Sequence, residues 1–178
     1  MSIFHILIEI NIQKLTVYKS IDKNWLVGDL RWHKKINLNP IFSTYISTAA
    51  NGVGQELDSF KTPIGKHRIK AKIGHNHSLG SVFVGRRPTG EIWTESLSKK
   101  YPNRDWILTR ILWLSGLEKG KNRFGSVDTM RRYVYIHGSP PPVKMGKVGS
   151  KGCIRMTGKD VITLFNIVPN GTTVNLKL

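Results

Sequence analysis

The sequence predicts a mainly-β fold with a β-sandwich or barrel-like core and one or two short helices. Most apolar residues lie in short runs rich in β-branched and aromatic side chains, and Gly, Pro and Asn turns separate these runs. Only one stretch shows a convincing helical period. The chain has 178 residues, 39% of them hydrophobic, which is enough for one core. We therefore expect residues 1–178 to form a single domain without an internal repeat or linker.

The predicted strands follow one another along the chain. Residues 4–10 and 14–18 flank a short "NIQ" stretch and predict an N-terminal hairpin. Residues 105–114 are mostly apolar on both alternating faces, which is typical of a central strand buried on each side. Further strands are expected at residues 25–32, 41–48, 67–73, 80–85, 91–96, 133–137 and 172–178.

One helix is expected near the C-terminus. Thr157 and Asp160 have the spacing of a capping box, and apolar residues recur at helical spacing from Val161 to Val168. The turn sequence "PNG" at 169–171 ends this helix. A short helical turn is also expected around residues 126–132.

The chain is strongly basic. It has 28 Lys and Arg residues against 11 Asp and Glu residues, a formal net charge of +17, which attracts nucleic acid, acidic membranes or an anionic cell-wall polymer. The basic residues are spread along the whole chain, which weakens a nucleic-acid interpretation. The tryptophans lie mostly in apolar strand patterns, which favours core packing over base stacking, so no nucleic-acid partner is expected. They are Trp25, Trp32, Trp93, Trp106 and Trp113.

The cysteine and histidine content limits the kinds of site. Cys153 is the one cysteine, so intramolecular disulfides and cysteine-based metal clusters are excluded. The sequence has no P-loop or GxGxxG motif, and its histidines lack carboxylates at ligand spacing, so no metal or cofactor is expected. The histidines that invite a metal interpretation are His33, His67, His75 and His77.

The N-terminal segment is apolar but differs from a signal peptide. It has no basic n-region, polar residues interrupt its apolar run, and no small-residue cleavage site follows. The sequence also lacks a run of about 18 apolar residues that could span a bilayer. From the residues alone we expect neither an export signal nor a membrane span.

Cys153 is the first candidate for catalysis. A thiol attacks as its thiolate, and the flanking Lys151 and Arg155 are expected to lower its pKa. The Ser150–Gly152 stretch is flexible enough to direct backbone N–H groups at an oxyanion. The alternative is an inert buried cysteine.

His137 is the candidate base. It lies 16 positions before Cys153, at the end of a predicted strand and before a glycine. The intervening proline-constrained loop could return the thiol to the imidazole, and a cysteine nucleophile needs such a base. The alternative is a hydrogen-bonded structural histidine.

The segment "YVYIHGSPPPVKMGKVGSKGCIRM" (133–156) resembles the signature of the L,D-transpeptidase catalytic domain family, also called YkuD-like. That signature is His-Gly, a spacer, then Ser-x-Gly-Cys followed by an aliphatic residue and Arg. Upstream "STAANGV" and "KTPIGKHRI" and the closing "DVITLFNIVPNGTTVNL" are similar to the family as well, so the resemblance runs from about Ile3 to the end. Lys151 departs from it, because many members have His there. The resemblance implies a mostly-β sandwich with the site at its edge.

The resemblance implies roles for individual residues. Cys153 would be the acylated nucleophile, His137 its base, and the Gly138 main chain the group that orients the imidazole. Arg155 would shape the site or hold a substrate carboxylate. The oxyanion-side and substrate-binding residues would be Ser150, Lys151, Gly152 and Arg155.

The resemblance also implies an activity, which is a two-step acyl transfer on peptidoglycan stem peptides. Cys153 attacks the carbonyl that precedes a terminal D-alanine, D-alanine leaves, and an amine of another stem resolves the thioester. Carbapenem-type inhibitors and a location in the cell envelope are then expected. Two alternatives remain: an L,D-carboxypeptidase that uses water as acceptor, and a non-catalytic basic β-domain that binds wall polymer or nucleic acid. The sequence leaves the acceptor and the oligomeric state open.

Overall fold

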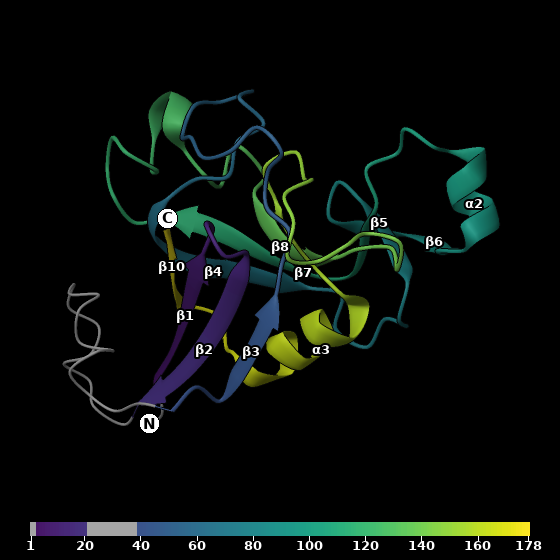
Figure 1. The fold of residues 1–178 in the computed structure, drawn as a ribbon, viewed down its shortest axis with the longest axis horizontal. Helices are drawn as coiled ribbons and strands as arrows, with labels where there is room; N and C mark the ends of the chain where they lie inside the picture. The colour runs from purple at the N-terminus through teal and green to yellow at the C-terminus, as the bar shows by residue number, and fades with distance from the viewer. Residues whose placement is uncertain (1–2, 21–38) are drawn as a thin grey trace.

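The computed structural model describes residues 3–20 and 39–178. Their strands form one mixed sheet that curls into a half-barrel, with two short α-helices beside it (Figure 1). The predicted mainly-β class is confirmed, although a single curled sheet replaces two stacked sheets. The assignment of residues 1–178 to one domain stays a prediction.

The elements follow the chain in a simple order. The strands are β1 (Ile3–Glu9), β2 (Lys14–Ser20), β3 (Phe42–Tyr45), β4 (Gly65–Ile73), β5 (Ser81–Val84), β6 (Arg87–Ile92), β7 (Ile107–Gly116), β8 (Tyr135–Gly138), β9 (Ile154–Met156) and β10 (Thr173–Lys177). The helices are α2 (Glu95–Lys100), the 3₁₀ turn η2 (Gly125–Val127) and α3 (Gly158–Ile167). Among the described residues, no helix is long and apolar enough to cross a membrane.

Sheet neighbours run in the order β3-β2-β1-β10-β4-β7-β5-β6, and β8 joins β7 to β9. The β1–β10 and β8–β9 pairs are parallel, whereas the other described pairs are antiparallel. The predicted N-terminal hairpin is therefore present as β1 and β2. β7 pairs with β4, β5 and β8 and is buried along most of its length, as its two apolar faces predict.

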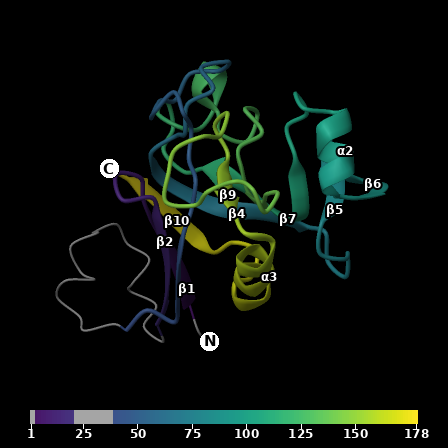
Figure 2. The same cartoon turned by 45° about the vertical axis from the view of Figure 1, so that its right-hand side comes forward.

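α3 covers one face of the curled sheet (Figure 2). Its buried residues Val161, Leu164 and Phe165 join the main core, which also contains Ile136 of β8 and Ile154 of β9. The side of β8 and β9 that faces this core is therefore apolar. Side chains of the opposite parity on β8 and β9 point to the other face of the sheet.

The structure differs from the predicted elements in three places. Residues 91–96 are not one strand, because β6 ends at Ile92 and the Thr94 hydroxyl caps α2 by accepting a hydrogen bond from Leu97 N at 3.1 Å. The helical turn expected at 126–132 is the 3₁₀ turn at 125–127. β9 was not predicted, and the strand predicted at 25–32 lies outside the described residues.

We predict that Thr157→Ala destabilises the fold by about 1 kcal/mol, the usual cost of losing a helix N-cap. Thr157 Oγ1 accepts a hydrogen bond from Asp160 N at 3.1 Å and donates one to Asp160 Oδ2 at 2.7 Å. Thermal unfolding followed by circular dichroism should show a Tm about 2–4 °C below wild type. Thr163→Ala is the matched control, because Thr163 is exposed within α3 and its hydroxyl bonds only to the helix backbone at Lys159 O. Equal Tm values for the two variants would contradict the role of the cap.

Candidate active site

The parallel pairing of β8 with β9 brings the predicted catalytic segments together. Its register places His137 beside Arg155, Ile136 beside Ile154 and Gly138 beside Met156. Cys153 directly precedes β9 and has the parity of Arg155, so it belongs to the face that carries His137 rather than to the core face. The sequence separation of 16 residues is thus closed by one crossover between neighbouring strands.

Cys153 is partly exposed and packs against the apolar cluster of Phe83, Ile111 and Tyr135. Tyr135 N donates a hydrogen bond to Sγ at 3.3 Å, and Sγ in turn donates to Tyr133 O at 3.5 Å. Tyr133 has φ +54, a left-handed conformation that non-glycine residues seldom adopt. The sulfur is therefore held by Tyr133 O and Tyr135 N, from a segment that enters β8 through a strained residue.

His137 is buried at the opposite end of β8, with 1% of its surface exposed. Its Nδ1 lies 2.9 Å from Gly138 O, the contact that the resemblance assigns to the Gly138 main chain. Since a carbonyl oxygen only accepts hydrogen bonds, Nδ1 carries the proton and Nε2 is the basic nitrogen. Gly138 leaves no room for a side chain, because a Cβ there would lie 2.7 Å from Leu108 O. The catalytic roles of both residues stay predictions.

An ion pair next to these residues acts on both of them. Arg155 Nη2 donates to Asp105 Oδ1 at 2.8 Å, and Arg155 Nη1 donates to Gly149 O at 2.9 Å. Asp105 raises and Arg155 lowers the pKa of Cys153 and of His137 alike. The thiol and the imidazole therefore lie in the field of the same pair of charges.

Burial controls the protonation of both groups. It raises the pKa of the Cys153 thiol to about 12, against the smaller lowering effects of the Tyr135 N–H, Arg155 and Arg132. It also lowers the pKa of His137 to about 4, although the Gly138 contact favours the charged ring. Arg155 lowers the thiol pKa, as expected of a flanking cation, but the net shift is upward. Desolvation outweighs this effect, and Asp105 offsets the charge of Arg155.

The loop before Cys153 is fixed by hydrogen bonds to its neighbours. The Ser150 hydroxyl donates to Cys153 O at 2.5 Å and accepts from Gly152 N at 3.2 Å. Thr62 Oγ1 donates to Gly152 O at 3.0 Å and accepts from Ala49 N, also at 3.0 Å. Gly152 has φ +120, a conformation that requires glycine. These hydrogen bonds hold the loop in one conformation, and its oxyanion role stays a prediction.

A cavity of about 530 Å³ opens onto Cys153. Arg86, Arg132 and Lys151 contribute cations to its wall, and Asp105 is the carboxylate among the lining residues. The other lining residues are Phe60, Gly85, Ile107, Tyr133, Val134, Tyr135 and Gly152. Because Asp105 is paired with Arg155, the cavity wall carries excess positive charge.

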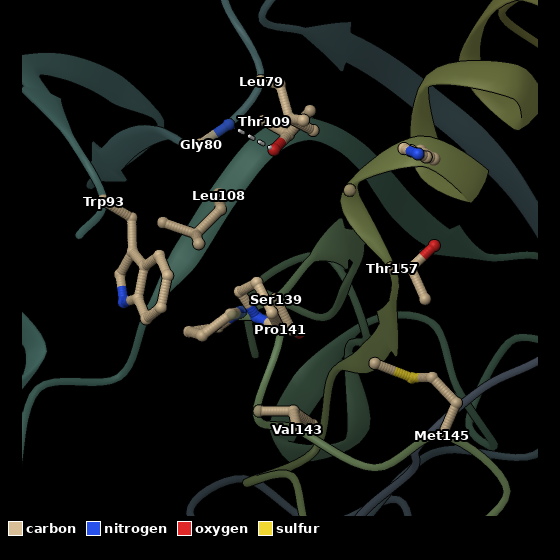
Figure 3. A pocket seen from close by; sticks show the side chains of 13 residues that line it. Leu79, Gly80, Trp93, Leu108, Thr109, Ser139, Pro141, Val143, Met145 and Thr157 are labelled. Atoms are coloured by element: carbon tan, nitrogen blue, oxygen red, sulfur yellow. Dashed lines mark hydrogen bonds between the residues drawn. The ribbon is translucent and has the colours of Figure 1, made fainter. Parts of the chain in front are cut away.

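A second cavity of about 500 Å³ lies where the loop after Gly138 meets the start of α3 (Figure 3). Its wall is mostly apolar and includes Trp93, Leu108, Pro141, Val143 and Met145. Ser139, which follows the His137–Gly138 pair in the chain, lines this cavity, whereas Cys153 does not. The two cavities thus flank the ends of β8 separately.

Comparisons with known proteins show the family to which the chain belongs. A model of the L,D-transpeptidase catalytic domain, YkuD, matches residues 5–176. The chain belongs to this family. "Putative L,D-transpeptidase YkuD" of Bacillus subtilis is 54% identical over 46 residues, which are 26% of this chain and 28% of that protein. The Bacillus licheniformis protein of the same name is 48% identical over 46 residues, with the same coverage.

Solved L,D-transpeptidases share the fold across the whole chain. L,D-transpeptidase 3 of Mycobacterium tuberculosis, solved with a faropenem-derived adduct, has a TM-score of 0.54 and 15% identity over 99% of this chain and 61% of that one. An Enterococcus faecium L,D-transpeptidase has a TM-score of 0.53 and 15% identity over 97% of this chain and 49% of that one. At these identities the likeness shows the fold alone, and the present chain spans only about half to three-fifths of these two proteins.

Several residues around Cys153 were not predicted from the sequence. Tyr135 and Asp105 were read only as parts of strands, and Arg132 only as part of a helical turn. Arg86 had an available signal, since "VGRRP" has the form of a two-residue hairpin turn between β5 and β6. The contacts of the other three depend on loops that meet only in the folded chain.

The described histidines that invited a metal interpretation make other contacts. His67 is buried between Gly65 O and Thr129 Oγ1, each 3.0 Å from a ring nitrogen, and burial lowers its pKa to about 4. His75 stacks on Phe165, and His77 meets the edge of Phe83. Within residues 3–20 and 39–178, no group of three or more His, Cys, Asp or Glu side chains could hold a metal ion. His33 lies outside the described residues.

We predict that Asp105→Asn makes Cys153 more reactive. Removing this carboxylate takes away a charge that raises the thiol pKa and frees Arg155, so the thiolate fraction increases. The rate of alkylation by iodoacetamide at pH 8 should rise on the order of tenfold, the effect of about one pKa unit. Glu95→Gln, which removes an exposed carboxylate paired with Lys99 on α2, should leave the rate unchanged. A slower or unchanged Asp105→Asn protein would contradict the assigned electrostatics.

Proposed function

We propose that this chain is a cysteine-dependent L,D-transpeptidase that acts on peptidoglycan stem tetrapeptides and works in the cell envelope. The observation that carries the proposal is the convergence of Cys153 and His137 on one face of the β8–β9 pair, within the field of one Asp105–Arg155 ion pair. Strongly perturbed thiol and imidazole groups beside a cavity are typical of catalytic sites. Family membership supplies the reaction class.

Both reacting groups start in their neutral forms. Nε2 of His137 is the free base, and the thiol proton is initially directed at Tyr133 O. Acylation requires that proton to turn toward the imidazole as the substrate enters, which agrees with the looser hydrogen bonds of substrate-free catalytic sites. Sulfur then attacks the carbonyl carbon, and its proton passes to Nε2.

The tetrahedral intermediate collapses when the C–N bond to D-alanine breaks. The proton on His137 passes to the leaving amine, so D-alanine departs neutral at nitrogen and Cys153 holds a thioester. The amine of a second stem attacks this thioester, gives its proton back through His137, and restores the thiol. The Ser150–Gly152 loop is held beside Cys153 by its hydrogen bonds. The N–H groups of Ser150 and Gly152 are bonded to Thr48 O and Ser150 Oγ, so the oxyanion role predicted for this loop would fall to its other backbone N–H groups.

We expect acylation to depend completely on Cys153. Wild-type protein incubated with a carbapenem should gain the mass of one inhibitor, and Cys153→Ala should gain none. With disaccharide-tetrapeptide as substrate, Cys153→Ala should lose D-alanine release entirely, and His137→Gln should lose about 10²–10⁴-fold. Intact-protein mass spectrometry and chromatography of the muropeptides measure both results. Wild-type protein that takes up no acyl group from either reagent would overturn the proposal, and tripeptide products without dimers would indicate the carboxypeptidase outcome.

The pH dependence of acylation provides a second test. His137 acts as base only when neutral, and burial lowers its pKa to about 4, so the base is available above about pH 4. The thiol pKa is raised to about 12, so the thiol stays protonated across the working range. The second-order rate of carbapenem acylation should therefore be nearly flat from pH 5 to 9. A decline on the acid side with an apparent pKa near 6.5 would show that His137 is hydrated rather than buried.

A further inference from the structure

Arg86 occupies an unusual position at the tip of the β5–β6 hairpin. Gly85 and Arg86 are the two residues of the turn, with φ +54 and +68. Positive φ at both positions is the pattern of a type I′ turn, in which Gly, Asn and Asp are normally favoured. An arginine in the left-handed region is unfavourable, and residues held in this way cluster at ligand-binding and active sites.

The side chain of Arg86 is fixed in one place. Its guanidinium carbon lies 4.6 Å from the ring centre of Trp113 and 4.7 Å from that of Tyr133. Its Nη1 donates a hydrogen bond to Tyr135 Oη at 3.0 Å. The Tyr135 contact uses Nη1, whereas a guanidinium has five N–H donors. The group is therefore held in advance of binding, with donor capacity along its edge.

The same residues connect Arg86 to the nucleophile. Arg86 and Cys153 line the same cavity, and Tyr135 lies between them, with its backbone N–H on Sγ and its hydroxyl on the guanidinium. A donor peptide that acylates Cys153 would therefore extend past Arg86 within one cavity. The peptide could contact both residues from the same side of the sheet.

The other arginines near Cys153 are already engaged. Arg155 is tied to Asp105 and to Gly149 O. Arg132 donates to three oxygens of one loop, which are Gly54 O, Ser59 Oγ and Lys61 O. These contacts hold the protein together around the site. Arg86 instead directs its charge into a cavity whose lining carboxylate is neutralised by Arg155.

We propose that Arg86 binds a carboxylate of the acyl-donor peptide and thereby sets the donor specificity of the Cys153 site. The inference rests on the proposed function, and it assigns to Arg86 the carboxylate contact that the sequence resemblance offered to Arg155. A planar guanidinium matches a carboxylate through two parallel hydrogen bonds, which lysine cannot reproduce. The carboxylate comes either from the C-terminal residue of the donor or from a residue earlier in the stem.

The test compares three donor peptides with four proteins. The donors are the free tetrapeptide, its C-terminal amide, and the tetrapeptide amidated at its internal α-carboxylate. The proteins are wild type, Arg86→Asn, Arg86→Lys and Arg87→Asn. Asparagine tolerates the left-handed conformation, so the turn is preserved, and Arg87 is the exposed neighbour of Arg86 in the same hairpin.

One of the amides should be a poorer donor for wild type by about 10–100-fold in kcat/KM, the range for a hydrogen-bonded charge. Arg86→Asn should lose about the same factor with the free tetrapeptide and should no longer distinguish that amide from it. Arg86→Lys should recover part of the discrimination, and Arg87→Asn should behave as wild type. The amide that wild type rejects identifies which carboxylate is bound. The proposal would be overturned if Arg86→Asn discriminated between the donors as wild type does. It would also be overturned if wild type used both amides as well as it uses the free tetrapeptide.

A binding measurement separates this inference from the proposed function. Calorimetric titration of the free tetrapeptide into Cys153→Ala and into Cys153→Ala/Arg86→Asn needs no chemistry. About 10–100-fold weaker binding by the double variant supports the role of Arg86 even if wild type transfers no acyl group. Equal affinities refute it even if the transpeptidase reaction is present.

Discussion

The parallel contact between β8 and β9 is the constraint on which the site depends. Two short strands, four and three residues long, carry an apolar face into the core through Ile136 and Ile154 and a polar face toward the Cys153 cavity. A shift of one residue in their register would place the core residues on the cavity face and the functional residues inside the core. The packing of α3 against Ile136 and Ile154 therefore fixes the chemistry on the other side of the same strands.

Desolvation is the dominant electrostatic effect at this site. The flanking charges of the "SKGCIR" segment suggest a stabilised thiolate, yet burial keeps the thiol neutral, and the Asp105–Arg155 pair contributes in both directions. A neutral thiol beside a neutral imidazole stores no ion pair before the substrate arrives. In the proposed reaction, charge separation occurs only as the bond to the carbonyl forms, where oriented backbone N–H groups can stabilise it. The hydrogen bonds of Thr62 and Ser150 to Gly152 fix the loop beside Cys153 before a substrate binds.

Much of the fold could be predicted because local patterns decide it. The N-terminal hairpin, the doubly apolar β7 and the capped α3 all follow from alternation, helical period and turn residues in short windows. β9 could not be predicted in this way, since three residues after a glycine loop become a strand only by pairing with β8. α2 was missed because the Thr94 cap was read as the continuation of a strand.

The sequence could single out Cys153 and His137, which the structure places on one face of the β8–β9 pair, but it could not predict their environment. Sequence spacing and family signature single out Cys153 and His137, whereas the sign of the thiol pKa shift depends on Phe83, Ile111 and Tyr135, which lie far from Cys153 in sequence. Asp105 likewise reaches Arg155 across 50 positions. Such long-range contacts have no signature in a short window, so the environment of the thiol could be obtained only from the folded chain.

The net charge of +17 acquires a more specific meaning once individual cations are placed. Arg132 and Arg155 form bonds around the Cys153 cavity, Arg104 pairs with Glu91, and Arg110 donates to backbone carbonyls near β7. Their charges therefore contribute to architecture rather than to a uniform polyanion-binding surface.

Arg86 differs in that a strained turn and two aromatic rings hold it at the wall of the cavity that Cys153 lines. An unfavourable backbone conformation persists only where surrounding contacts maintain it, and here those contacts lead through Tyr135 to Cys153. The distribution of cations thus favours recognition of one anionic group of a small substrate, next to Cys153, the proposed nucleophile.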